Sequence, residues 1–258
     1  MILYNSTCTK IITDNNKIKS IKINNDKNQE IEIECDYLIS SMPIKKVVSS
    51  LDADVPKNVK NIACKLPYRD FITVGLLVDR IKLENTTNIK TLNNIPPDCW
   101  IYVQDSNVKV GRIQFFNNWS PYMVRKPEKY IWIGLEYFCS ECDVFWNQTD
   151  EEIAMTAVNE LLFMKIIDRD NIIDSVVLRQ KKAYPAYFGT YSRFNIVKEY
   201  LNGFKNLICV GRNGQHRYNN MDHSMLTGIN AVKYVNGQIG IEDVWNVNVE
   251  QEYHEEGN

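Results

Sequence analysis

The sequence predicts an α/β protein, in its mixed α+β form, because the period of its apolar residues changes along the chain. Apolar and polar residues alternate over 7–13, 18–23 and 31–34, which is typical of strands with one covered face. An apolar run at 207–210 is followed by a polar segment and then by apolar residues at helical spacing. A strand, a polar segment and a helix in this order are typical of helices packed on a sheet.

The elements of the first 55 residues follow from turn residues and from one proline. Asp14–Lys17 and Asn24–Lys27 predict turns between the three alternating strands. Residues 37–40 predict a short buried strand, and Pro43 suits the first turn of a following helix. That helix has an apolar face, formed by Ile44, Val47, Val48 and Leu51.

The middle of the chain predicts a sheet with a few helices. The polar stretch 80–98 predicts an exposed connection, and the strands around it are aromatic and alternating, as in an antiparallel sheet with one wet face. Thr149 and Glu152 form a capping box at the start of one helix. Strands are expected at 70–78, 100–104, 110–116, 130–137 and 175–180, and helices at 56–66, 149–164 and 191–201.

The stretch from Leu207 to Met225 contains the strongest functional signal. Gly211 follows the apolar run and allows a tight turn, and Asn220 and Asp222 are candidate N-caps of the next helix. Met225, Leu226, Ile229 and Val232 fall on one apolar face of that helix. Because a helix N-terminus presents free N–H groups, this geometry favours an anion.

Gly211-Arg212, Tyr218 and Met221-Asp222 resemble the flavin-contacting motif of FAD-dependent oxidoreductases of the amine oxidase and protoporphyrinogen oxidase type. The motif is closest to the UDP-galactopyranose mutase branch, and Asp36–Pro43 resembles a second signature of the group. The resemblance implies that Arg212 neutralises the FAD diphosphate and that the helix start faces the flavin. The cofactor-binding residues that it implies are Cys8, Gly211, Arg212, Tyr218, Met221, Asp222 and His223.

A GxGxxG turn, with which such proteins begin, does not occur in this sequence. The resemblance therefore implies a partial FAD-binding Rossmann-type domain that lacks its N-terminal unit, with a mixed or antiparallel substrate domain inserted. We assign 1–55 and 204–240 to the FAD-binding domain, 56–203 to the substrate domain and 241–258 to an acidic tail. We expect weak or no FAD binding by this chain alone: either the chain is a fragment of a longer protein, or a separate chain supplies the GxGxxG half.

Candidate substrate residues are Tyr184, Tyr187 and Arg193, since tyrosines and arginines bind a nucleotide-sugar diphosphate in the mutases that the chain resembles. Packing of the tyrosines is the alternative. Arg112 and Glu136 are expected to form a cross-strand ion pair. No metal site is expected, because Cys139 and Cys142 form a single CxxC without a second ligand pair.

His216 and His223 are likewise poorly spaced for a metal and are expected to be polar lining. A net charge of −2 gives no general attraction to nucleic acid, and no apolar run is long enough to cross a membrane. Seven scattered cysteines without a secretion signal favour a cytoplasmic protein with reduced thiols.

Three functions remain open from the sequence. The first is the C-terminal portion of an FAD-dependent oxidoreductase, in which flavin N5 accepts a hydride from an unidentified substrate. The second is a flavin-dependent nucleotide-sugar mutase with no net redox change. The third is a truncated, non-catalytic binding module.

Overall fold

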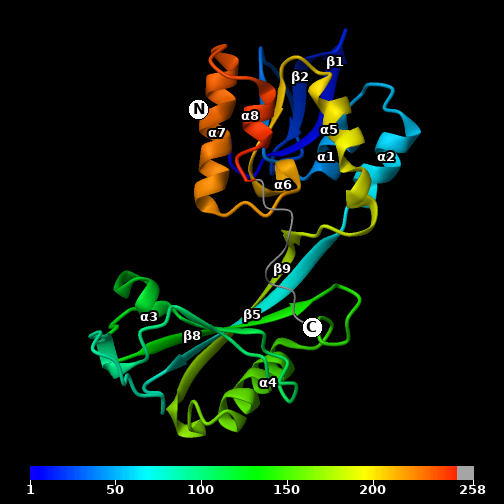
Figure 1. Cartoon of the computed structure of the whole chain (residues 1–258). Helices are drawn as coiled ribbons and strands as arrows, with labels where there is room; N and C mark the ends of the chain where they lie inside the picture. Colours follow the sequence, from blue (N-terminus) through cyan, green and yellow to red (C-terminus); the bar gives the residue numbers. More distant parts are fainter. Residues whose placement is uncertain (249–258) are drawn as a thin grey trace. The chain divides into compact units, whose positions relative to one another are not determined.

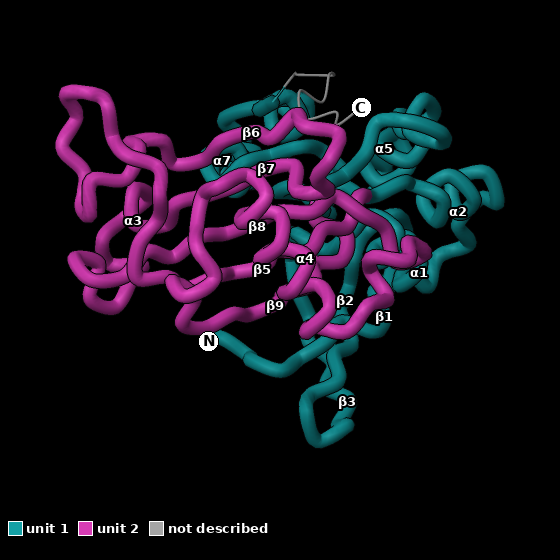
Figure 2. The backbone as a smooth tube through the Cα atoms, turned by 90° about the horizontal axis from the view of Figure 1, so that it is seen from below, with its two compact units in different colours: residues 1–68, 184–256, 258 teal, residues 69–183, 257 magenta. Residues whose placement is uncertain are grey.

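The computed structural model describes residues 1–248 and divides the chain into two compact units (Figure 2). In the described residues, unit 1 comprises Met1–Tyr68 and the chain from Tyr184 onward, and unit 2 comprises Arg69–Ala183. The sequence predicts these divisions at 55/56 and 203/204. The helices in the intervening segments, at Lys57–Cys64 and Phe194–Asn202, bury Val59, Ile62, Phe194 and Val197 in the core of unit 1.

A three-stranded antiparallel sheet begins unit 1. Its strands are β1 (Thr7–Asp14), β2 (Lys17–Asn24) and β3 (Glu30–Glu34), in that order, as the alternating pattern predicts. Asn15 and Asn16 both have positive φ angles in the first hairpin turn, a conformation that asparagine tolerates better than most residues.

A second, parallel sheet pairs two strands that are far apart in sequence, β4 (Leu38–Ser40) and β10 (Leu207–Cys209). Helices α1 (Ile44–Ser50), α2 (Lys57–Cys64) and α5 (Phe194–Asn202) share a core with Leu207 and Cys209. Helices α7 (Met221–Val235) and α8 (Ile241–Trp245) cover Ile208 and Val210 on the other side (Figure 1). This sheet therefore has helices on both faces, as α/β folds require.

Unit 2 contains a five-stranded sheet in the order β6-β7-β8-β5-β9. Pairing is antiparallel between β6 and β7, β7 and β8, and β8 and β5, which confirms the predicted antiparallel sheet. The strands are β5 (Tyr68–Val78), β6 (Trp100–Tyr102), β7 (Arg112–Phe115), β8 (Ile131–Cys139) and β9 (Ile172–Pro185).

One face of this sheet forms the core of unit 2 with α4 (Asp150–Phe163). The predicted capping box is present: Glu152 N–H donates to Thr149 Oγ1, and Thr149 N–H donates to the Glu152 carboxylate. The described chain also contains the short helix α3 (Phe116–Trp119) and four 3₁₀ turns, which lie at Leu92–Asn94, Pro121–Met123, Arg169–Asn171 and Gly189–Arg193.

The prediction that the chain after Gly240 lies on the surface is wrong for the part that the structure describes. Residues 241–245 form α8, in which Val244 and Trp245 are buried. These two apolar side chains pack against the β10 side of unit 1, which outweighs the acidic composition of the segment. Residues 249–258 lie outside the described residues. No helix among residues 1–248 has the length and apolar character needed to span a bilayer.

Candidate functional site

The candidate site is built on the turn that follows β10. Gly211 has a φ of +74°, a backbone conformation that glycine adopts without steric cost. Its N–H donates to Thr227 Oγ1 at 2.9 Å, which ties the turn to α7. The predicted loop instead begins with the short helix α6 (Gly211–Gln215), because Gln215 donates to the backbone oxygens of Cys209 and Val244 and fixes this turn.

The two predicted flavoprotein signatures meet at this turn. Ser40 at the end of β4 pairs with Cys209 at the end of β10, and Val210 N–H donates to Ser40 O at 3.0 Å. A Cβ atom on Gly214 would lie 2.7 Å from Ser40 O. The backbone of α6 therefore lies directly against the step from β4 to α1, at the carboxyl ends of the two parallel strands, where α/β folds place ligands.

Arg212 is held by its neighbours in a fixed orientation. Its Nε donates to Asn219 O at 2.9 Å and its Nη2 to Asn220 Oδ1 at 3.3 Å. The guanidinium lies 4.7 Å from the ring centre of Tyr218 and 5.4 Å from that of Tyr184. The two rings stack at 5.5 Å, so Tyr184, predicted to bind substrate, joins two residues predicted to bind the cofactor.

Tyr187 adjoins the same cluster. Its hydroxyl accepts a hydrogen bond from Tyr218 N–H at 2.5 Å, and its ring stacks on Tyr191 at 4.7 Å. Burial raises the pKa of Tyr187, so it stays protonated and can also donate. Tyr187 and Tyr191 line a hollow of about 360 Å³ together with Arg217, a residue that is not part of the flavin-contacting motif.

Arg193, predicted to reach a cleft shared with Tyr187, does not line this hollow. It is exposed at the N-cap of α5, and the arginine that lines the hollow is Arg217. The extended alternation assumed in the sequence analysis ends at Pro185, since a 3₁₀ turn at Gly189–Arg193 rotates the chain away from that pattern.

The start of α7 has no side-chain cap. Asn220 occupies the predicted N-cap position, but its side-chain oxygen accepts from Arg212 and makes no capping hydrogen bond. Met221 is 83% exposed, and Asp222 lies in the first turn, where its charge suits the helix dipole. His223 Nδ1 lies 3.7 Å from Asp222 Oδ1, too far for a hydrogen bond. The predicted cap geometry is therefore present, while the capping interaction is absent.

His216 is not polar lining but part of a buried aromatic cluster. Its ring is fully buried, lies edge-on to Tyr68 at 4.7 Å and contacts the rings of Tyr191 and Phe194. Burial lowers the pKa of His216 to about 4 and raises that of Tyr68 to about 12. Both side chains are therefore neutral near pH 7. A sequence pattern does not reveal this, because Tyr68 and His216 are brought together only by the fold.

Buried polar atoms without a hydrogen-bond partner are concentrated in this region. Folded proteins satisfy nearly all such atoms, so a cluster of exceptions calls for an explanation. Five of the seven unpartnered side-chain atoms of the described chain belong to the Gly211–His223 stretch or to its neighbour Tyr68. They are Tyr68 Oη, Asn213 Oδ1, His216 Nδ1, Asn219 Oδ1 and His223 Nδ1.

The other predicted residues lie elsewhere. Cys8 is half-buried on β1, where its thiol donates to Lys10 O, and burial raises its pKa. In unit 2, Arg112 and Glu136 pair across β7 and β8 with Nε–Oε2 and Nη2–Oε2 distances of 2.8 and 2.6 Å, which confirms the predicted ion pair. Burial raises the pKa of the Cys139 thiol to about 11, which disfavours the redox chemistry of a CxxC.

Solved structures of flavoenzymes share this fold. A reduced UDP-galactopyranose mutase aligns with 93% of the chain at a TM-score of 0.72 and 21% identity. A protein assigned as a protoporphyrinogen oxidase, from Exiguobacterium sp. 255-15, aligns with 89% of the chain at a TM-score of 0.59 and 14% identity. A redesigned putrescine oxidase aligns with 90% of the chain at a TM-score of 0.57 and 12% identity. The chain has the fold of FAD-dependent enzymes.

That fold is present only in part. The chain spans 49%, 47% and 48% of the lengths of these three structures. No protein-family model matches the sequence, and no curated protein is significantly similar to it. At these low identities the likeness establishes the fold alone.

Proposed function

We propose that unit 1 supplies the C-terminal part of an FAD site in a flavin-dependent oxidoreductase. The observation that carries this proposal is the cluster of unpartnered buried polar atoms beside the Gly211 turn. Asn213 and Asn219 offer side-chain oxygens, and His223 offers a ring nitrogen, without partners in the described chain. A polar ligand along this segment would satisfy them, and the segment lies where parallel strands end.

Arg212, its two aromatic neighbours and the start of α7 each have a role in this proposal. Arg212, fixed by Asn219 and Asn220, places a guanidinium where a diphosphate would be neutralised. The stacked rings of Tyr218 and Tyr184 lie 4.7 and 5.4 Å from that guanidinium, within the range of cation–π contact. The uncapped N-terminus of α7 offers N–H groups and a positive dipole end to a flavin carbonyl. FAD, when bound, would accept a hydride at its flavin N5.

A nucleotide-sugar mutase is the second candidate. The mutase structure aligns at a TM-score of 0.72, against 0.59 and 0.57 for the two oxidases. In this proposal Tyr184 and Tyr187 contribute to a small-molecule or nucleotide-sugar site. Arg217, which lines the hollow beside Tyr187, takes the substrate-binding role expected of Arg193. Assays with UDP-galactopyranose and with an artificial electron acceptor distinguish the two activities.

We also propose that a further polypeptide segment, carrying a strand, a GxGxxG turn and a helix, completes the site. Ile39 pairs with Ile208 in parallel register, so both side chains project to the face that α7 covers. Ile208 is fully buried there, whereas Ile39 is 44% exposed. A helix on this face beside α7 would cover Ile39, and a strand parallel to β4 would extend the two-stranded sheet.

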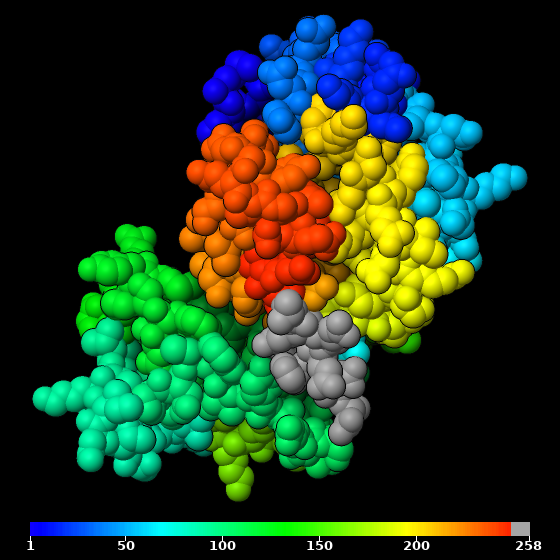
Figure 3. All heavy atoms as spheres, turned by 45° about the horizontal axis from the view of Figure 1, so that its top comes forward, coloured from blue at the N-terminus to red at the C-terminus, as the bar shows by residue number. Residues whose placement is uncertain are grey.

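The outer surface of α7 also favours packing of this further polypeptide segment against unit 1. The predicted apolar stripe is exposed, and α7 packs on β10 through Thr227 and Ala231 instead. In Figure 3, α7 and α8 (orange to red) form part of the surface of unit 1. A Cβ atom on Gly228 would touch nothing within 4 Å. The exposed stripe consists of Met221, Met225, Leu226, Ile229 and Val232.

Flavin binding tests these proposals. The N-terminal half of a UDP-galactopyranose mutase, ending before the strand that matches β1, is added to the chain in trans or joined before Met1. We expect FAD uptake with the added half, and at least tenfold weaker uptake for Arg212→Gln. Arg193→Gln, an exposed arginine outside the hollow, serves as the matched control.

Two outcomes would contradict these proposals separately. A folded fusion that takes up no FAD would refute the flavin site. If the half added in trans associates equally with wild type and with Met225→Lys/Ile229→Lys, the stripe on α7 is not the docking surface. Lys233→Gln, on α7 but outside the stripe, is the control for that measurement.

A further inference from the structure

Unit 2 contains a second hollow, of about 560 Å³, on the sheet face opposite α4. Leu77 on β5 and Trp132 on β8 are register partners and form its floor. Their neighbours along the strands, Leu76 and Ile133 among them, are buried in the core on the other face. Because successive strand residues alternate between faces, Leu77 and Trp132 project away from that core.

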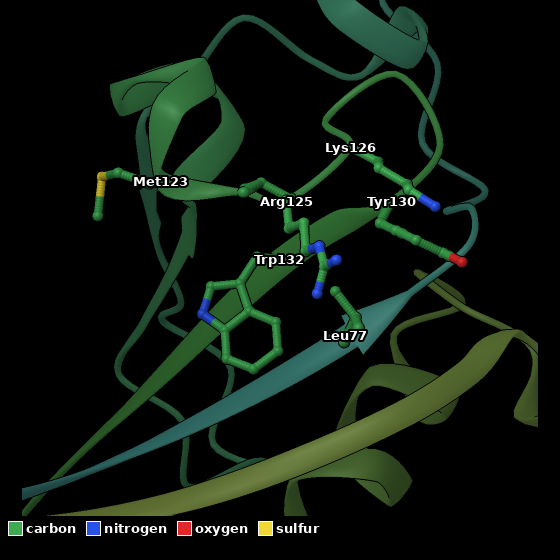
Figure 4. Close-up of a pocket in the computed structure, with 7 residues that line it drawn as sticks. Leu77, Met123, Arg125, Lys126, Tyr130 and Trp132 are labelled. Carbon is green, nitrogen blue, oxygen red and sulfur yellow. The ribbon is translucent and has the colours of Figure 1, made fainter.

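Trp132 lies flat on the sheet because there is no side chain beneath it. A Cβ atom on Gly75 would come within 2.8 Å of Trp132 Cζ2. The absence of that atom lets the indole lie along the strands, where its ring and Leu77 give the hollow an apolar floor (Figure 4). A planar, apolar group is the complement of such a surface.

The cations of the hollow come from one loop, whose backbone is fixed. The buried side chain of Asn117 donates to Tyr130 O at 2.8 Å and accepts from Trp132 N–H at 3.0 Å. Asn93 donates to Pro127 O at 2.7 Å from another segment. The loop therefore positions its side chains before any ligand arrives, which lowers the entropic cost of binding.

Arg125 and Lys126 carry the positive charge of this loop into the hollow. Figure 4 shows the guanidinium of Arg125 above the floor between Trp132 and Leu77, and the ammonium of Lys126 on the side of Tyr130. Within residues 1–248 neither cation has a carboxylate partner. Lys126 also has a φ of +60°, a strained conformation for a residue with a side chain.

We propose that this hollow binds a small planar anion, an aromatic ring bearing a phosphate or a carboxylate. The ring lies on Trp132 and Leu77, and the anionic group lies between Arg125 and Lys126, with the Tyr130 hydroxyl as a further donor. The volume is within the range of small-molecule sites, roughly 300–1,000 Å³. The site is formed by unit 2 alone and requires no flavin.

The test is calorimetric titration of the full chain with phenyl phosphate, benzoate and phenol, combined with NMR shifts of the indole N–H signals. We expect one of the two anions to bind at least tenfold more tightly than neutral phenol, and the tighter one identifies the anionic group. Arg125→Gln/Lys126→Gln should weaken its binding at least tenfold. Arg80→Gln/Lys90→Gln, which removes two exposed cations elsewhere in unit 2, should leave it unchanged.

A variant of Trp132 tests whether the apolar floor contributes to binding in addition to the two cations. Trp132→Leu should weaken the aromatic anion and leave inorganic phosphate, titrated alone, at its wild-type affinity. The proposal is overturned if neither anion binds in the millimolar range, if phenol binds as well as the anions, or if Arg125→Gln/Lys126→Gln binds the anion as tightly as wild type. Amide hydrogen exchange of β5 and β8 verifies that each variant is folded. None of these readouts depends on FAD.

Discussion

Gly214 and Ser40 lie so close that a Cβ atom at position 214 would be 2.7 Å from the Ser40 carbonyl oxygen. This contact joins α6 to the end of β4, two segments that are far apart in sequence. We predict that Gly214→Ala lowers the free energy of unfolding by about 1–3 kcal/mol, the usual cost of overpacking. Urea unfolding of unit 1, followed by tryptophan fluorescence, measures the change.

Gly228→Ala is the matched control, because the same methyl group meets open space on α7. Alanine has the higher helix propensity, so this variant should be more stable by roughly 0.5–1 kcal/mol. Equal destabilisation by both variants would show that the Gly214–Ser40 contact is not what limits residue size at position 214.

His216 should make stability depend on pH. Burial lowers its pKa to about 4 in the folded chain, below the ordinary value of 6.5, so the unfolded chain binds the proton first. The stabilisation is complete above pH 6.5 and is lost as the pH falls from 6.5 to 4. It amounts to roughly 3 kcal/mol at most. Urea unfolding at several pH values measures it.

His216→Asn tests the assignment, since asparagine tolerates the positive φ of 47° at this position. The loss of stability between pH 6.5 and 4 should be smaller in this variant than in wild type, whatever its stability at pH 7. His223→Gln, which changes a half-exposed histidine, should retain the wild-type dependence. An unchanged pH profile in His216→Asn would assign the dependence to other groups.

Asn206 connects the two sheets of unit 1. Its side chain accepts from Ile18 N–H at 2.7 Å and donates to Ile18 O and Asp36 O at 2.8 and 2.7 Å. Asn206→Ala leaves these buried backbone groups unpaired, so we predict a loss of roughly 2–4 kcal/mol in unfolding free energy. Asn202→Ala, which removes one bond to Trp245, should cost less than half as much. Similar losses would contradict the bridging role of Asn206.

The sequence predicts the local elements of this fold well. The Asn15–Asn16 turn, the capping box of Thr149 and the pairing of Arg112 with Glu136 all depend on residues that are close in sequence or in adjacent strands, so patterns reveal them. The burial of His216 beside Tyr68 depends on contacts across the chain, which periodicity does not contain.

The apolar stripe of α7 shows a different limit. Period-3.6 spacing correctly indicates an apolar face, but it does not tell whether that face is covered by this chain or by another segment. The candidate site is affected in the same way. Gly211, Arg212 and Tyr218 are found from a motif, whereas Asn213 and Asn219 become informative only when their unpartnered oxygens are seen.

Arg112 and Glu136 form a shielded ion pair, with side chains 13% and 6% exposed. Gln114 also donates to Glu136, and removing Arg112 takes the guanidinium away from a carboxylate that stays buried. We predict that Arg112→Met lowers the unfolding free energy by roughly 3–5 kcal/mol, the usual cost of an uncompensated buried charge. Glu136→Gln should also destabilise, because it leaves the guanidinium without its carboxylate.

The double variant distinguishes an ion pair from simple packing. Arg112→Met/Glu136→Gln removes both charges, so its loss should be smaller than the sum of the single losses by at least about 1 kcal/mol. The exposed pair Lys82–Asp168 provides the comparison, with a coupling of at most about 1 kcal/mol. Urea unfolding of all variants at pH 7 gives both cycles. Additive losses at Arg112 and Glu136 would mean that each side chain acts through its own packing, because two charges stabilising each other cannot be removed independently.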